Sequence, residues 1–353
     1  MHRKLVSALL AGLIAGFALA PSAQATGDVW VEGSYEFLNL PNVQFINNYF
    51  FAAGLDGVSR EEFVNDDGDF DGFRIDGGIS NIPIMGGAYM IGLKGFFAWH
   101  DDGSELQCTV PAAVSGSACL ANPLVDNTAI IQAVSAAPGT NQFTTNRDVD
   151  HWGVAIEVAQ GPMGLKVGPA FRRIDQDITI TGRKINSFPA APDPFQLTYS
   201  EDLETNYWGA FVGADGSIDL GSGWALVADG EAGLYWADTD YSGSYVVTNA
   251  LTAVAPPVNP NVSQSLTLES DELAFIGVLK AALEKDFGMF KLAGFGRVEY
   301  ISSAPDVGYN DLDVVAGVFT VVQGSEDETR IGERYAVAAS VGARLIVPMG
   351  SAQ

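Results

Sequence analysis

The chain has 353 residues, and its 43 aspartates and glutamates outnumber its 18 lysines and arginines to give a net charge of −25. This acidity argues against nucleic-acid binding, which needs a basic surface. Glycine is abundant at 40 residues, 10% of the chain is aromatic, and only 17% is charged.

The N-terminal segment predicts export. A short basic start is followed by an apolar run and then by the small-residue pattern Ala23-Gln24-Ala25, which is typical of a cleaved signal peptide. We therefore expect residues 1–25 to be a signal peptide and residues 26–353 to be one β-barrel domain. No later stretch approaches the run of about 20 apolar residues that a membrane helix needs. An exported membrane protein without such helices is a closed barrel, and the competing class is a secreted soluble β-protein.

Alternating side chains then predict strands in chain order. In the hairpin over 206–238, Trp224 and Trp236 stand at the two ends of an apolar face, whereas Asp229 and Glu231 lie on the opposite face. A strand that is apolar outside, aromatic at its ends and polar inside is typical of a transmembrane β-barrel. The same alternation predicts strands in 29–37, 73–80, 89–100, 151–159, 165–174 with a continuation through 185, the two arms of 206–238, 273–284, 290–300 and 334–347.

These segments predict an all-β fold, a transmembrane antiparallel up-and-down barrel of about ten strands. Short turns follow every second strand and long loops follow the others, so short turns are expected in the periplasm and long loops outside. Residues 101–148 read as an irregular loop. Twelve strands result if 313–322 also enters the membrane. A helix is the rival interpretation of 278–288, but the clear strand at 290–300 needs a partner there.

For one predicted strand, the sequence does not decide which face points toward the lipid. In the first arm of the hairpin, Tyr207 and Phe211 compete with Trp208 and Val212 for the lipid. The inward positions of all strands are nearly balanced in charge. They hold Glu32, Glu36, Arg74, Asp76, Lys94, Glu157, Lys166, Arg172, Asp229, Glu231, Glu272, Lys280, Lys291, Arg297, Glu299, Arg334 and Arg344.

Two interpretations of these inward charges remain open. They form either a lattice of ion pairs that holds the barrel together or the charged lining of a pore whose acidic loops enrich cations. Barrels of about eight strands are filled by side chains, so ten strands make a narrow channel. Asp229 and Glu231 also resemble the paired carboxylates of a glycosidase, but ion pairing with a neighbouring base suits a narrow lumen better.

The run YWGAFVGADGSIDLGSGWALVADGEAGLYW resembles the pore-forming barrels typified by the Legionella major outer-membrane protein. GFRIDGGIS, LKVGPAFRRID and VWVEGSYEFL are similar to other strands of that family. The resemblance touches most predicted strands and few loops, and it implies a pore-forming barrel of the bacterial outer membrane. The chain ends in PMGSAQ, without the terminal aromatic residue that the barrel-assembly machinery, the expected insertion partner, reads in many such proteins.

Three loop features carry candidate chemistry. Asp67, Asp69 and Asp71 match the opening of a calcium loop, yet the twelfth position is Gly78 rather than glutamate, so a solvated acidic loop competes with a Ca²⁺ site in an outer loop. Cys108 and Cys119 lie in one predicted loop, where an oxidising periplasm permits a disulfide; two separate thiols are the alternative.

Two histidines flank the same predicted loop. His100 and His151 are expected to face inward at the outer rim, near Asp101, Asp102 and Asp150. A metal site or a His–Asp pair of an outer-membrane protease would need such residues. No other motif of such proteases is recognisable, so rim histidines in a polar setting are the simpler interpretation.

The leading functional expectation is a narrow, cation-preferring pore for small solutes or ions, which is not an enzyme and needs no cofactor. The alternative is a non-conducting structural or surface-interaction barrel whose acidic loops bind cations, lipopolysaccharide or a partner. An outer-membrane protease stands third. The expected surroundings are outer-membrane lipid and lipopolysaccharide.

Overall fold

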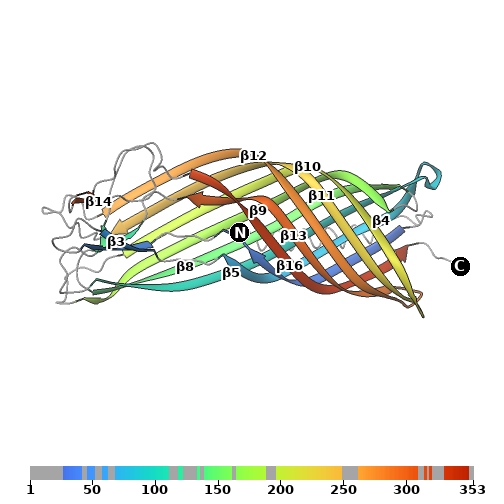
Figure 1. Cartoon of the computed structure of the whole chain (residues 1–353), viewed down its shortest axis with the longest axis horizontal. Coiled ribbons are helices and arrows are strands. Elements are labelled where there is room, and N and C mark those ends of the chain that lie inside the picture. The colour runs from blue at the N-terminus through green and yellow to red at the C-terminus, as the bar shows by residue number, and fades with distance from the viewer. Residues whose placement is uncertain are drawn as a thin grey trace.

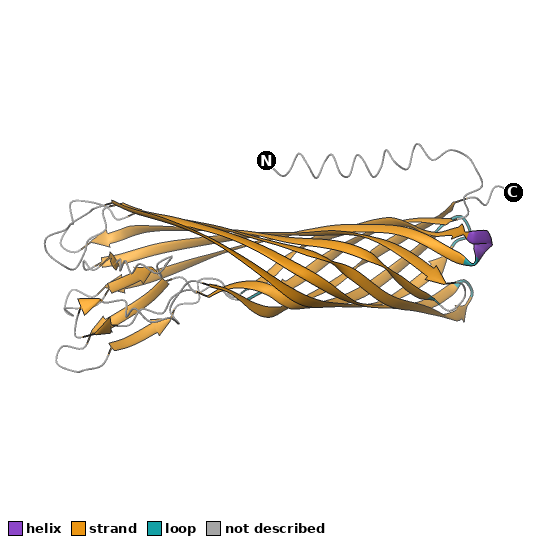
Figure 2. Cartoon of the chain, turned by 90° about the horizontal axis from the view of Figure 1, so that it is seen from above, coloured by secondary structure: helices purple, strands orange, loops and turns teal. Residues whose placement is uncertain are grey.

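Ten long strands form one closed antiparallel barrel in the computed structural model (Figures 1 and 2), as the sequence predicts. The structure describes residues 27–41, 46–51, 58–62, 68–110, 118–121, 133–135, 139–160, 164–187, 196–248, 261–308, 314–315, 318–319 and 330–349. The expected signal peptide lies outside these residues and stays a prediction. The barrel strands are β1 (Gly27–Asn39), β4 (Asp69–Ile84), β5 (Tyr89–Val110), β8 (Gly139–Gln160), β9 (Leu165–Ser187), β10 (Gln196–Gly221), β11 (Trp224–Thr248), β12 (Asn261–Asp286), β13 (Lys291–Gly308) and β16 (Arg330–Met349).

Each barrel strand pairs with its neighbours in chain order, and β1 pairs with β16 from Gly27↔Met349 to Asn39↔Val337 to close the ring. Closure leaves no sheet edge within the membrane, where no water would satisfy it. The turn between β10 and β11 is tight, and Gly221 and Gly223 adopt positive φ there, which glycine does at little cost. The described chain has one short 3-10 turn, η1 (Met85–Gly87), and none of its helices is long and apolar enough to cross a membrane.

The outside of the barrel carries a belt of exposed apolar side chains. On β10 the structure settles the open question of face, because Trp208 is 59% exposed whereas Tyr207 is 0% exposed. Leu279 on β12 and Val341 on β16 belong to the same belt. A belt of this kind around a closed barrel needs lipid rather than water against it. The protein is therefore an outer-membrane β-barrel, and the end with the short turns is assigned to the periplasm.

Several strands are far longer than a membrane requires. β10, β11 and β12 have 26, 25 and 26 residues, whereas about 9–11 residues span a bilayer. The expectation of an irregular loop over 101–148 is wrong at both ends, since β5 continues to Val110 and β8 begins at Gly139. Trp99, Trp152, Trp208 and Trp236 point outward from the wall. We call the parts of β5, β8, β9, β10, β11 and β12 that lie beyond the level of these tryptophans, away from the periplasmic end, the outer extension.

Smaller elements gather at the end of the barrel that carries the outer extension (Figure 1). β2 (Ile46–Phe51), β3 (Val58–Glu62), β6 (Ala118–Ala121) and β7 (Ala133–Ser135) form a separate four-stranded sheet. β14 (Val314–Val315) pairs only with β15 (Val318–Phe319) among the described strands, so the twelve-strand alternative does not hold there. Cys108 lies on β5 and Cys119 on β6, but their side chains are outside the described part, and the disulfide stays a prediction.

A closed barrel of this kind should be heat-modifiable on a gel. Because every barrel strand is paired around the ring, we expect purified protein in mild detergent to resist unfolding until boiled. The unheated sample should then migrate differently from the boiled one on cold gel electrophoresis. Identical mobility of the two samples would contradict the closed ring.

Candidate functional site

Most of the charged side chains that alternation predicts to point inward lie in the barrel lumen, which begins at the periplasmic end with a cavity of about 250 Å³. We call this cavity the vestibule. Most of its charged lining forms ion pairs across the lumen, whereas Asp215 is exposed. The pairs join Lys94 with Glu231 and with Glu157 at 3.6 Å, Lys166 with Asp229 at 2.7 Å and with Glu231 at 2.9 Å, Glu32 with Lys280, and Glu32 with Arg344 at 3.3 Å.

Above the vestibule lies a buried network that we call the ionic centre, formed by Glu36, Arg74, Asp76, Arg172, Arg297 and Glu299. Arg74 connects three carboxylates, with Asp76 at 3.1 Å, Glu299 at 3.3 Å and Glu36 at 3.4 Å. The other two guanidinium groups complete the network, because Arg297 pairs with Asp76 at 2.8 Å and Arg172 pairs with Glu299.

Charge balance explains why this network tolerates burial. Three guanidinium groups face three carboxylates, so the ionic centre is neutral. Each carboxylate accepts hydrogen bonds from at least one guanidinium, which offsets part of the cost of removing the charges from water. The Arg74 guanidinium also stacks over the Phe96 ring at 3.7 Å, and this contact fixes its plane. All six side chains of this network are buried in the lumen, so water has little access to them.

His100 and His151 lie against the ionic centre rather than at the outer rim where they were expected. Both side chains are buried, with the Nε2 atom of His100 3.4 Å from Glu36 and that of His151 3.9 Å from Glu299. The strands continue well beyond these histidines, which is why they are deep. Asp150 occupies an outward position on β8, because adjacent residues of a strand point to opposite faces and His151 points inward. Asp150 therefore does not face His151 as the His–Asp pair of a surface protease would require.

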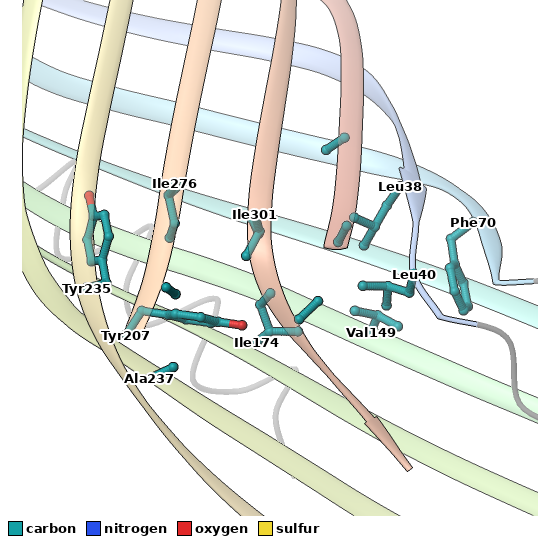
Figure 3. Close-up of a cluster of buried hydrophobic side chains, with 14 residues drawn as sticks. Leu38, Leu40, Phe70, Val149, Ile174, Tyr207, Tyr235, Ala237, Ile276 and Ile301 are labelled. Atoms are coloured by element: carbon teal, nitrogen blue, oxygen red, sulfur yellow. The ribbon is translucent and has the colours of Figure 1, made fainter. Parts of the chain in front are cut away.

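An apolar cluster lies directly beyond the ionic centre, and we call it the apolar plug. Along β1, β9 and β13, Leu38 follows Glu36, Ile174 follows Arg172 and Ile301 follows Glu299 in the outer direction. Figure 3 shows Tyr207 reaching across the lumen toward Ile174, and the Tyr207 hydroxyl donates a hydrogen bond to the Ser303 carbonyl oxygen at 2.9 Å. The plug consists of Leu38, Leu40, Phe70, Val149, Ile174, Tyr207, Tyr235, Ala237, Ala274, Ile276, Ile301, Ala304, Ala336 and Ala338.

Further polar residues are buried beyond the plug, and the sequence analysis missed them. Arg147 donates to the Pro41 carbonyl oxygen at 3.0 Å and also to Gln176. Glu201 accepts a hydrogen bond from the Tyr241 hydroxyl at 2.7 Å. The sequence pattern predicts a loop at Arg147 because its outward neighbours, Asn146 and Asp148, are polar rather than apolar. The alternation of buried Phe143, Thr145, Arg147 and Val149 was the available signal.

Three predicted interior residues lie at the margins of the lumen. Glu272 accepts a hydrogen bond from Ser303 at 3.1 Å near the outer end, and Lys291 pairs with Glu284 at 3.0 Å near the periplasmic end. Arg334 departs from the interior pattern, because its side chain is 64% exposed and pairs with Asp306 at 2.9 Å. It lies beyond the end of the pairing between β16 and β1 at Val337, where β16 pairs with β13 alone.

The proposed calcium ligands are only partly described. Asp69 accepts a hydrogen bond from Asn39 at 2.6 Å, Asp71 accepts one from Tyr35, and Asp67 lies outside the described residues. Within the described chain, no cluster of three or more histidine, cysteine or acidic residues is arranged to hold a metal ion. The calcium site stays a prediction.

The closed barrel, the apolar belt and the filled lumen define the class as an outer-membrane β-barrel. No protein-family model matches the chain, and no curated protein matches it. Among solved structures it is similar to the outer-membrane protease OmpT of Escherichia coli, with 11% identity, a TM-score of 0.39, and coverage of 93% of this chain and 98% of that one.

Two further solved barrels are similar at the same low level. For the translocator domain of the autotransporter NalP of Neisseria meningitidis, the identity is 11%, the TM-score 0.33 and the coverage 98% and 95%. For the toluene transporter TodX of Pseudomonas putida, the corresponding values are 10%, 0.29, 95% and 91%. These values transfer no activity to the chain. The resemblance to the Legionella family likewise stays an expectation.

Proposed function

We propose that this protein is a non-conducting outer-membrane barrel that acts as a structural and surface-interaction protein. The observation that carries the proposal is the filled lumen, in which the ionic centre and the apolar plug are stacked on each other. Ions move through a barrel only along a continuous aqueous path, and apolar constrictions stop them by excluding water. The vestibule ends at the ionic centre and therefore supports a blind cavity rather than a channel.

The charges of the lumen support the same proposal. A cation-preferring pore would be expected to carry an excess of acidic groups that face water along its path. Here most of the vestibule acids face lysines or arginines, and Glu231, for example, contacts both Lys94 and Lys166. The charges are engaged in holding opposite walls together, which is a structural role. The narrow pore, small-solute transport and the absence of enzymatic activity remain expectations.

The outer extension supports a role at the cell surface. Its outward face is acidic. Asp148 and Asp150 on β8 lie beyond Trp152 in the outer direction, and Asp238 and Asp240 on β11 lie beyond Trp236. These carboxylates lie where lipopolysaccharide, cations or a protein partner would meet the barrel. A long, rigid wall carrying charge outside the membrane suits presentation of a binding surface better than passage of a solute.

Conductance tests the proposal directly. Purified protein inserted into a planar lipid bilayer should leave the current flat over the applied voltages, with insertion verified separately by protease protection of the reconstituted barrel. A known porin inserted under the same conditions is the positive control. Discrete conductance steps from the pure protein would overturn the proposal and restore the narrow pore.

A further inference from the structure

The outer extension is a sheet that runs from β5 to β12, and the strand at the second of these ends, β12, has an open edge. β12 pairs with β11 from Asn261 to Lys285, but it pairs with β13 only from Ile276 to Asp286. Among the described residues, no strand pairs with the other side of β12 between Asn261 and Phe275. The reason is a register shift between β13 and β16 after Ile301, beyond which β13 follows β16 alone.

A single hydrogen bond fixes the direction of the free backbone groups. The Phe275 N–H donates to the Ser302 Oγ at 2.8 Å, so this N–H points away from β11 and toward the open side. In an antiparallel strand, alternate residues direct both backbone groups to the same side. The β11–β12 register is regular throughout. Leu273, Asp271, Glu269 and Thr267 therefore present N–H and C=O groups along the open edge.

Beside this edge the outer face carries two acids among polar residues, and the inner face carries two leucines followed by Ser270 and Glu272. Thr267, Glu269 and Asp271 are exposed, whereas Leu266 and Leu268 are partly buried toward the inside. A strand added here would place alternate residues beside the acids and the intervening residues beside the leucines. Its matching pattern alternates basic with apolar residues.

The acids beside the edge also lack compensation from the barrel itself. Asp271 lies opposite Asp238 and Glu269 lies opposite Asp240 across β11, and like charges in such pairs destabilise a sheet. Burial raises the pKa of Asp238, and the nearby Asp240 and Asp271 carboxylates raise it further. No lysine or arginine of the described chain forms an ion pair with these four acids.

Neighbouring acids on the same face have a base. Arg173 on β9 pairs with Asp175 at 2.7 Å and with Glu204 at 2.5 Å. Asp148 on β8 also lies opposite Asp177 on β9, so facing acids occur elsewhere on the wall, but the pairs on β11 and β12 are the ones beside the open edge. A bound strand with basic residues would neutralise these acids as Arg173 neutralises Asp175 and Glu204.

We propose that the open edge of β12 binds an extended peptide segment of a partner protein as an added strand, with basic residues outward and apolar residues inward. The proposal names the partner class for the surface role proposed above and does not depend on whether the lumen conducts. Added strands gain affinity from backbone hydrogen bonds and specificity from alternate side chains. A second copy of the chain fits poorly, because residues 261–273 contain two glutamates and one aspartate but no base.

The probe is a fluorescent peptide of about ten residues that alternates lysine and valine, long enough for β-strand addition. Protein in phosphatidylcholine nanodiscs is titrated while the anisotropy is followed, with empty discs as the blank. We expect saturable binding to the wild type. Binding should weaken by about tenfold or more when the Glu269→Gln and Asp271→Asn changes are combined, since two opposed charges are lost.

Two matched pairs separate strand addition from simple charge attraction. Thr267→Pro removes one N–H at the open edge without touching the β11 ladder, and Thr267→Val keeps that N–H. Of these two variants, we expect only the proline variant to bind the probe more weakly. A probe whose alternate backbone amides are N-methylated should bind none of the variants. Equal binding by the proline and valine variants would overturn strand addition.

The remaining outcomes are also decisive. If no lysine–valine peptide binds while the protein stays monodisperse, the acids only protect the edge from self-pairing, and the proposal is wrong. Dimerisation through β12 in the Glu269→Gln/Asp271→Asn variant would point to the same protective role. The conductance test reads the lumen and not this edge, so the two proposals succeed or fail separately.

Discussion

Replacing Arg74 by methionine is expected to destabilise the barrel by about 3–5 kcal/mol, the usual cost of removing one partner from a buried ion pair. Arg74 contacts Glu36, Asp76 and Glu299 within 3.4 Å, and all are buried. Its loss leaves three carboxylates with two guanidinium groups. The midpoint of urea unfolding in detergent micelles, followed by tryptophan fluorescence, should fall markedly.

Arg334→Met is the matched control for this change. Arg334 also forms an ion pair, with Asp306 at 2.9 Å, but its side chain is 64% exposed. Exposed pairs contribute about 0–1 kcal/mol, so the unfolding midpoint should hardly move. Adding Glu36→Gln to Arg74→Met should recover part of the lost stability, because it restores two charges of each sign. Equal shifts from the Arg74 and Arg334 variants would show that the ionic centre is hydrated.

The sequence predicted the barrel because, within the membrane, the two faces of a strand meet opposite environments. Trp224 and Trp236 face lipid and Asp229 and Glu231 face the lumen, and this contrast is visible in any single strand. Beyond the outward tryptophans the contrast is inverted. Asp148 and Asp150 face outward on β8, whereas the apolar Phe143 and Val149 are buried.

This inversion explains why the sequence pattern predicts loops over much of the outer extension, although it predicts the continuation of β9 through residue 185. A search for apolar outward faces finds none beyond the membrane, although the period of two persists. The inversion has a physical cause, since water replaces lipid outside and the packed interior remains apolar. The predicted strands are therefore too short on most of the strands that leave the membrane, whereas the number of strands and the length of β9 are predicted.

The state of the lumen was harder to predict than the identity of its residues. Arg74 and Glu299 are 225 positions apart in the chain, and only the tilt and stagger of the strands bring them together. The apolar plug likewise depends on Leu38, Ile174 and Ile301 arriving at one level from three strands. Alternation places each of these side chains inside, but it does not say which of them meet.

The apolar plug should be what keeps the ionic centre dry from the outside, so removing it should let current through. In the double variant Ile174→Ala/Tyr207→Ala, two buried side chains of the plug are truncated. Water can then reach the ionic centre from both the vestibule and the outer side. Hydrated ion pairs attract each other weakly, and ions can pass between them. We expect discrete conductance steps in planar bilayers that the wild type does not give.

The matched control truncates the other face of the same wall. Trp208 and Val212 point outward from β10 and are exposed to lipid, so Trp208→Ala/Val212→Ala removes comparable bulk without touching the lumen. Each core truncation costs about 2–5 kcal/mol, and heat-modifiable mobility must first show that both variants are closed barrels. A folded plug variant that stays insulating would assign closure to the ionic centre alone. Conductance in the outward control as well would mean that the current comes from a loosened wall, and the plug would lose its proposed role.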